Sequence, residues 1–242
     1  MTLHNFVGQT LGELGYDSNP YFVNLRNGQF QKADFVETQV QFYFAVIFFS
    51  RPMAALAAKI PTPELRVEIV RNVWEEHGEG MATKIHGTTF REFLKRLDNV
   101  SSGYIESRML WPEVRMFNTT LVGTAVLDDY LVGCGMMGII ERMFSDISVW
   151  IGQGIVEQGW VSESQMVHYK IHQNLDVKHS QDFFNVLEHS WNAEDKSQYL
   201  IKQGLLLGAY IFDALYRGLW QNRHRRWECG KLGPPSQSEG IS

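Results

Sequence analysis

The stretch IHQNLDVKH, residues 171–179, contains two histidines and one aspartate at spacings of four and three residues. On an α-helix each residue advances the chain by about 100° and 1.5 Å, so His172, Asp176 and His179 fall within about 60° of one another. The spacing therefore predicts a helix that has three metal-binding side chains along one face.

The distance between the two histidines indicates more than one ion. His172 and His179 are seven residues apart, which is about 10 Å along an undistorted helix axis. They would reach a single ion with difficulty, whereas each could bind one of two neighbouring ions with Asp176 between them. The spacing favours a dinuclear centre, which needs further ligands from other helices. His168, one turn before His172, offers a competing His-x-x-x-His pair.

The segment NVWEEHGEGMATKIH, residues 72–86, is a first source of further ligands. It contains Glu76, Glu79 and His86 around two glycines, which tend to interrupt a helix. Taken alone, an acidic cluster of this kind is more often a solvated helix end than a metal site. A single histidine on a helix is also more often an ordinary core or surface residue.

The segment GMMGIIERMF, residues 135–144, is a second source of ligands. Here Glu141 is the first charged residue after Asp129, in a strongly apolar stretch. Burial of an unpaired charge is costly, so Glu141 needs a partner. That partner could be a metal ion or an arginine such as Arg142 or Arg115.

The hydrophobic pattern has helical periodicity along most of the chain, with neither sustained alternation nor hairpin dipeptides. The sequence predicts an all-α protein of about seven helices, in one domain that spans residues 1–229. The expected helices cover residues 33–59, 62–77, 83–97, 112–154, 162–177, 180–191 and 192–227. Residues 230–242, GKLGPPSQSEGIS, are rich in Gly, Pro and Ser and are predicted to form a disordered tail.

The composition excludes several classes of function. The 242 residues have a formal net charge of −5, whereas nucleic-acid binding needs clustered Lys and Arg. Two cysteines, Cys134 and Cys229, are too few for a disulfide scaffold or a zinc framework. Neither a secretory signal nor an apolar run of about 18 residues is recognisable, which favours a cytoplasmic protein without a membrane partner.

In their order along the chain, these glutamates and histidines resemble the ligands of the heme-oxygenase-like diiron oxidases and oxygenases. The fold of that family is shared with thiaminase-like and pyrroloquinoline-quinone-synthase-like enzymes. The resemblance covers residues 33–192, and residues 72–78 are similar to the family's N-L-x-D-E-x-G helix end. His-x-x-x-Asp-x-x-His is the most specific part of the match.

The resemblance implies a heme-oxygenase-like bundle and two iron ions, with O2 as co-substrate and an external electron donor. It implies six metal ligands: Glu76, His86, Glu141, His172, Asp176 and His179. Glu79 is the alternative to Glu76, since it is seven residues from His86 and better phased on a continuous helix. One partition gives three ligands to each iron: Glu76, His86 and His172 to one, and Glu141, Asp176 and His179 to the other.

Family members oxidise small molecules, and the run FYFAVIFF, residues 42–49, favours an aromatic or otherwise apolar substrate, although it would equally suit an ordinary core. The most specific expectation, which rests on a resemblance to nitrile-forming enzymes of that family, is oxidative cleavage of a tryptophan-type amino acid to a nitrile in natural-product biosynthesis. N-oxygenation, or C–C-cleaving or alkene-forming oxidation of an amino acid or fatty acid, is the first alternative. A metal-free thiaminase-like or pyrroloquinoline-quinone-synthase-like enzyme is the second, and a non-catalytic helical interaction module the third.

The expected partner is a small-molecule substrate, and the sequence is also compatible with a homodimer. Four residues are candidates for binding the substrate because of their neighbourhood in the sequence: Tyr43, Arg115, Tyr130 and Tyr169.

Overall fold

The computed structural model describes residues 1–230, apart from the side chains at positions 167, 171, 173 and 174. The described residues form ten α-helices, joined by turns and four short 3₁₀ segments, and they contain no β-strand. The helices are α1 Leu3–Leu14, α2 Pro20–Arg26, α3 Lys32–Lys59, α4 Pro63–Glu76, α5 His86–Asp98, α6 Ser102–Ser107, α7 Pro112–Leu127, α8 Tyr130–Glu157, α9 Val167–Trp191 and α10 Asp195–Gln221. The all-α prediction is confirmed. Nearly all of the predicted tail, residues 231–242, lies outside the described part.

Two predicted boundaries are wrong, for identifiable reasons. The helix expected over 112–154 is divided into α7 and α8, because Asp129 has an extended backbone and its side chain accepts a hydrogen bond from the Leu131 amide at 2.8 Å. This is an N-cap. Conversely, the helices expected over 162–177 and 180–191 are joined in α9. The Ser180 hydroxyl donates to the Val177 carbonyl at 2.8 Å inside the helix, so it does not cap a new one.

Three helices were not predicted: α1, α2 and α6. Side-chain caps mark their starts, since Thr2 accepts from the Asn5 amide, and Ser101 accepts from the Tyr104 amide. Asn19 caps α2, which has Pro20 in its first turn. Their shortness gave periodicity little to detect, and the capping residues were the available signal.

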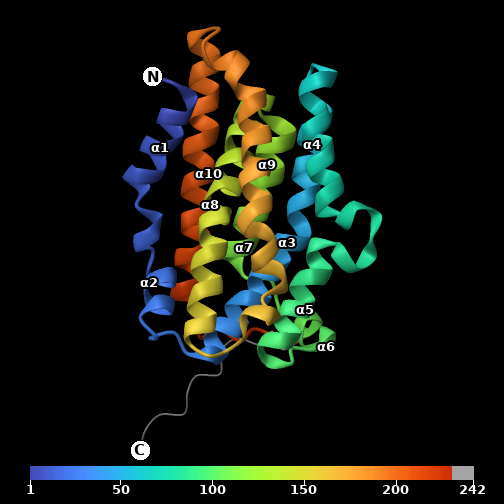
Figure 1. Cartoon of the computed structure of the whole chain (residues 1–242), viewed down its shortest axis with the longest axis vertical. Helices are drawn as coiled ribbons and strands as arrows, with labels where there is room; N and C mark the ends of the chain where they lie inside the picture. Colours follow the sequence, from blue (N-terminus) through green and yellow to red (C-terminus); the bar gives the residue numbers. More distant parts are fainter. Residues whose placement is uncertain (231–242) are drawn as a thin grey trace, which may run out of the picture.

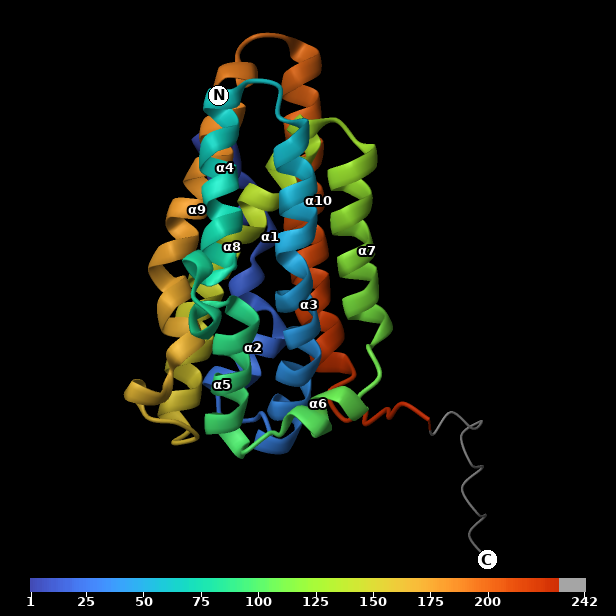
Figure 2. The same cartoon turned by 90° about the vertical axis from the view of Figure 1, so that its right-hand side faces the viewer.

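Helix α8 is central and packs most extensively against α9 and α10. Helix α3 packs against α7 on one side and against α4 and α5 on the other, and both α4 and α5 also contact α9. Figure 1 shows α1 and α2 along one side of this bundle, and Figure 2 shows α4 and α5 beside α9. The inner faces of α4, α5, α8 and α9 therefore meet.

The crossing of α8 and α10 is unusually close and requires glycine at position 204. A Cβ atom on Gly204 would lie 2.1 Å from the Val132 carbonyl oxygen, far inside van der Waals contact. The two backbones can approach only because this side chain is missing. This contact fixes α8, on which Glu141 lies.

Helix α3 is the one helix among residues 1–230 that is long and apolar enough to cross a membrane. Half of its apolar window is buried inside the bundle, and Glu37, Gln39 and Gln41 on it are fully buried. A core helix passes the same test of length and composition, so this finding is weak evidence for a membrane span.

Candidate metal centre

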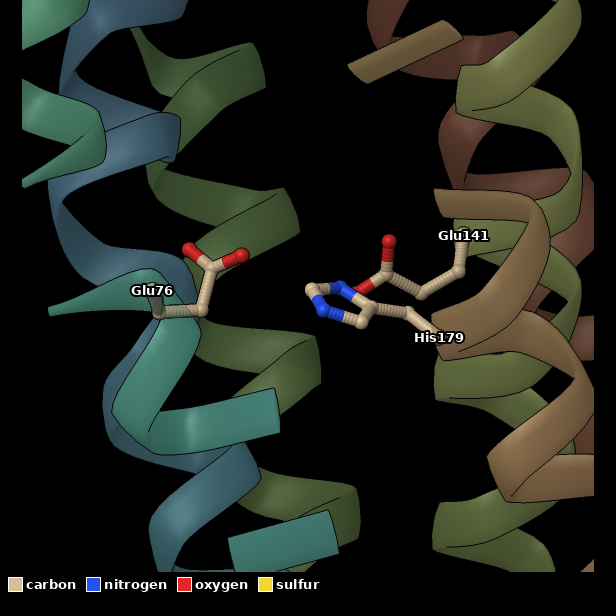
Figure 3. A group of neighbouring side chains, drawn as sticks. All are labelled: Glu76, Glu141 and His179. Atoms are coloured by element: carbon tan, nitrogen blue, oxygen red, sulfur yellow. The ribbon is translucent and has the colours of Figure 1, made fainter. Parts of the chain in front are cut away.

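Three buried side chains from three helices converge between α4 and the α8–α9 pair (Figure 3). They are Glu76 at the end of α4, Glu141 in the middle of α8 and His179 on α9. One ligand atom from each lies within 4.8 Å of the other two. Two atoms that bind the same ion at about 2.0–2.2 Å can be at most about 4.4 Å apart, so a small contraction would let all three share one ion.

His86 joins this group through a sharp reversal of the chain between α4 and α5. Gly78 has a left-handed backbone (φ 66°), and a Cβ atom there would lie 2.5 Å from the Ile85 nitrogen. The turn brings His86, the first residue of α5, back to the end of α4. Its Nδ1 lies 2.9 Å from Glu76 Oε1, and both side chains are buried.

Glu79 lies in the same turn but faces away from the cluster. Its backbone is left-handed (φ 53°), its side chain is 53% exposed, and its carboxylate is 3.9 Å from Lys84 Nζ. Of the two glutamates considered from the sequence, Glu76 is the one that the fold brings to the other ligands.

The stripe formed by His172, Asp176 and His179 on α9 faces the cluster along its whole length. His172 Nδ1 is 2.8 Å from Asp176 Oδ1, and the His172 ring centroid is 4.4 Å from that of His86. One turn further on, His179 Nδ1 is 3.7 Å from Glu141 Oε1, too long for a hydrogen bond. The two ends of the stripe thus meet different partners, an arrangement compatible with two neighbouring ions.

Glu75 is a functional candidate that the sequence analysis did not select. Its Oε2 accepts from His179 Nε2 at 2.7 Å, and Lys178 donates to its other oxygen at 2.9 Å. This hydrogen bond leaves His179 Nδ1 facing Glu141, and metal-binding histidines commonly use their second nitrogen in this way. The only signal in the sequence was its position next to Glu76.

A cavity with about 440 Å³ of space not filled by protein atoms, part of it open to solvent, borders the cluster. Five phenylalanines line it: Phe42, Phe49, Phe117, Phe144 and Phe212. Its polar lining consists of one group of side chains: Glu76, His86, Glu141, His168 and His172. Phe42 and Phe49 belong to the FYFAVIFF run, so that run does face the candidate ligands.

The four candidates for substrate binding lie elsewhere. Tyr43 packs on Phe90, Arg115 is exposed on α7, and Tyr130 begins α8. Tyr169 is buried and its hydroxyl donates to Gln39 Oε1 at 2.5 Å. None of the four lines the cavity, so their role stays a prediction without support from its lining.

Comparison with known proteins identifies the family. A family model described as "Iron-containing redox enzyme" matches residues 36–210, which include all six candidate ligands. The chain belongs to this family. No curated protein matches the chain in sequence.

Several solved structures have the same fold as this iron-containing redox enzyme. A domain of unknown function with a heme oxygenase-like fold from Shewanella denitrificans has a TM-score of 0.75 at 12% identity, over 92% of each chain. A TenA homologue from P. horikoshii has a TM-score of 0.72 at 12% identity, over 91% of this chain and 99% of its own. A TenA homologue from Pseudomonas syringae pv. tomato has 0.69 at 14%, over 89% and 93%. At these identities the likeness shows the fold alone, and the predicted heme-oxygenase-like fold is confirmed.

The cluster has the unsatisfied atoms that an iron site requires. Eleven buried side-chain nitrogen or oxygen atoms in the described residues have no hydrogen-bond partner, and five of them belong to this cluster and its cavity. Four are on predicted ligands: Glu141 Oε1, His172 Nε2, Asp176 Oδ2 and His179 Nδ1. Buried polar atoms without partners are rare in folded proteins, and mixed carboxylate and imidazole donors suit iron. The residues present therefore fit the metal of this family.

The electrostatics of the cluster favour a cation. Burial raises the pKa of Glu141 to about 7, with Asp176 adding to the shift, and burial also raises the pKa of Asp176 well above its usual value. Burial would raise the pKa of Glu76 too, but the charge and hydrogen bond of His86 outweigh it and lower the pKa to about 2. Burial would lower the pKa of His179, whereas Glu141 raises it to about 10. Protons on Glu141 and His179 thus occupy places that a metal ion could take.

Proposed function

We propose that this iron-containing redox enzyme is a non-heme diiron, O2-dependent oxidase or oxygenase of a small amine-containing substrate. One observation supports this most: four of the six candidate ligands, together with His168, form the polar wall of a cavity that is otherwise apolar. The four ligands are Glu76, His86, Glu141 and His172. A metal centre and a substrate space would therefore share one boundary.

In this proposal Glu76, His86 and His172 would hold one iron, and Asp176, His179 and Glu141 would hold the other. Glu76 also lies close to the second set, since it has a ligand atom within 4.8 Å of those of Glu141 and His179. When bound, the two ions supply electrons and positive charge for the reduction of O2 next to the substrate. Glu75 holds the His179 ring through Nε2. The phenylalanine side chains exclude water from the substrate side of the site.

The lining favours an aromatic amino acid as substrate. Phe42, Phe117, Phe144 and their neighbours offer an apolar surface for an aromatic ring, and the metal ions at the polar wall would attract the lone pair of a neutral amino group. Our best candidate is a tryptophan-type amino acid that is oxidised to a nitrile in natural-product biosynthesis. N-oxygenation, or oxidation that cleaves a C–C bond or forms an alkene, is the alternative outcome at the same centre.

The experiment is an anaerobic Fe(II) titration followed by rapid mixing with O2. Tryptophan, brominated tryptophan, other amino acids and fatty acids would be compared, with mass spectrometry of the products. We expect two irons per chain and a transient absorption band that one substrate class triggers. A protein that binds no iron, or binds two and oxidises none of these compounds, would contradict the proposal.

A metal-free enzyme is the second candidate, since TenA homologues are among the structural neighbours. Relatives of that kind would use a reactive side chain such as a cysteine. Cys134 is fully buried and outside the cavity lining, and burial raises its thiol pKa. Full turnover of a substrate in the presence of a strong chelator would favour this candidate. Cytoplasmic location, an external electron donor and a homodimer remain proposals from the sequence.

A further inference from the structure

His168 lines the cavity but is outside the set of six candidate ligands. It lies on α9 one turn before His172, its side chain is fully buried, and its ring centroid is 4.7 Å from that of Phe90. Its Nε2 atom has no hydrogen-bond partner. An unpaired polar atom on the wall of an apolar cavity is a natural contact for a ligand.

The hydrogen bonds of Thr89 indicate which nitrogen of His168 carries the proton. The Thr89 hydroxyl donates its single hydrogen to the His86 carbonyl at 3.0 Å. The same oxygen is 3.0 Å from His168 Nδ1, and both contacts are hydrogen bonds at once only if this oxygen accepts from Nδ1. This arrangement places the hydrogen on Nδ1 and leaves a free lone pair on Nε2 of this cavity-lining side chain.

No donor among the described residues reaches His168 Nε2. Its ring lies against those of Phe90 and His172, with centroids 4.7 and 4.2 Å away. A positively charged donor would be repelled by the metal ions that Glu76 and Glu141 would hold on the same wall. The substrate group that suits the His168 lone pair is therefore a neutral N–H donor in an otherwise apolar ring.

We propose that His168 Nε2 accepts a hydrogen bond from the ring N–H of an aromatic substrate. This contact selects indole-type rings over rings of the same shape that lack an N–H. The inference rests on the proposed function in that it places the aromatic substrate in this cavity, and it adds the residue that recognises the ring.

The test compares indole with benzothiophene, which has a similar shape but no N–H. Binding of each to the Fe(II)-loaded protein is measured by calorimetry without O2. We expect the wild type to bind indole about ten-fold more tightly, the effect of one buried hydrogen bond. His168→Phe should bring this ratio to about one, while His168→Gln should retain part of it, because an amide oxygen can accept.

Two further variants act as controls. His189→Gln changes an exposed histidine on the same helix and should leave the ratio unchanged. Thr89→Val removes the hydroxyl that fixes the tautomer and should lower the ratio without loss of iron. Iron content and circular dichroism are measured for each variant.

A wild-type ratio near one, or the same ratio in His168→Phe, would overturn the inference. So would loss of iron from a folded His168→Phe protein, because His168 would then be a ligand. The proposed reaction is judged separately. If the indole preference depends on His168 but no product forms from tryptophan and O2, only the reaction is wrong.

Discussion

Replacement of Glu75 should weaken metal binding although Glu75 is not itself a predicted ligand. Its carboxylate accepts from the fully buried His179 at 2.7 Å, and its own side chain is only 15% exposed. Loss of such a partner typically lowers metal affinity by about 10- to 100-fold, or about 1.4–2.7 kcal/mol. Glu75→Gln keeps an acceptor without the charge, so we expect about 10-fold. Glu75→Ala removes both, so we expect about 100-fold. Lys178, the other partner of Glu75, is 44% exposed and should contribute little.

The assay is competition for Fe(II) with a coloured chelator under anaerobic conditions. Glu79→Gln is the matched control, because the Glu79 side chain is 53% exposed and meets only Lys84 at 3.9 Å. We expect the control to bind iron like the wild type. Unchanged affinity in Glu75→Ala, or equal losses in Glu75→Gln and Glu79→Gln, would refute the role given to this hydrogen bond.

Three other predictions follow from the site and the fold. Asp176→Ala should lower the iron content to one or less per chain and abolish turnover; a fully active variant would show that Asp176 is not a ligand. Iron affinity should fall as the pH is lowered from about 8 to about 6, because His179 (pKa about 10) and Glu141 (pKa about 7) hold protons that the metal must displace. Calorimetry in buffers of different ionisation enthalpy would count the released protons, and a pH-independent affinity would contradict the assignment. Gly204→Ala should destabilise the protein by about 1–3 kcal/mol in thermal unfolding, since its Cβ would lie 2.1 Å from the Val132 carbonyl oxygen. Gly123→Ala, with no atom within 4 Å, should be neutral or stabilise by up to about 1 kcal/mol, and equal effects of the two variants would refute the close-crossing argument.

The residues on α9 show what the sequence could predict. The positions of His172, Asp176 and His179 on one helix face depend only on helical periodicity, and all three side chains are buried in the structure. The preference for Glu76 over Glu79 depended on glycines breaking a helix, and the left-handed turn at Gly78 agrees with that reasoning. Local rules therefore placed the three α9 residues on one face and favoured Glu76 over Glu79, whereas the family resemblance was needed to name His86 and Glu141 as ligands.

Contacts between distant segments were not predictable in this way. Glu75 and His179 are 104 residues apart, and nothing local to Glu75 distinguishes it from a surface glutamate. Arg115 was considered a substrate-binding candidate because of its neighbourhood in the sequence, but only the rotation of α7 in the bundle decides that it is exposed. The break at Asp129 had a capping signal that the long apolar pattern around it obscured.

Because the chain reverses between α4 and α5, a metal ion at this site would also cross-link the chain. An ion bound by both Glu76 and His86 would close a loop of about ten residues, and one bound by Glu76 and His172 would close a loop of about 100. In the chain-entropy treatment of cross-links, such closures lower the conformational entropy of the unfolded chain. The corresponding stabilisation of the folded state is about 3 and about 4.7 kcal/mol. The two loops overlap, so these values do not add. Iron in this family member would then hold together helices that are distant in sequence. Iron binding would therefore contribute to folding as well as to catalysis.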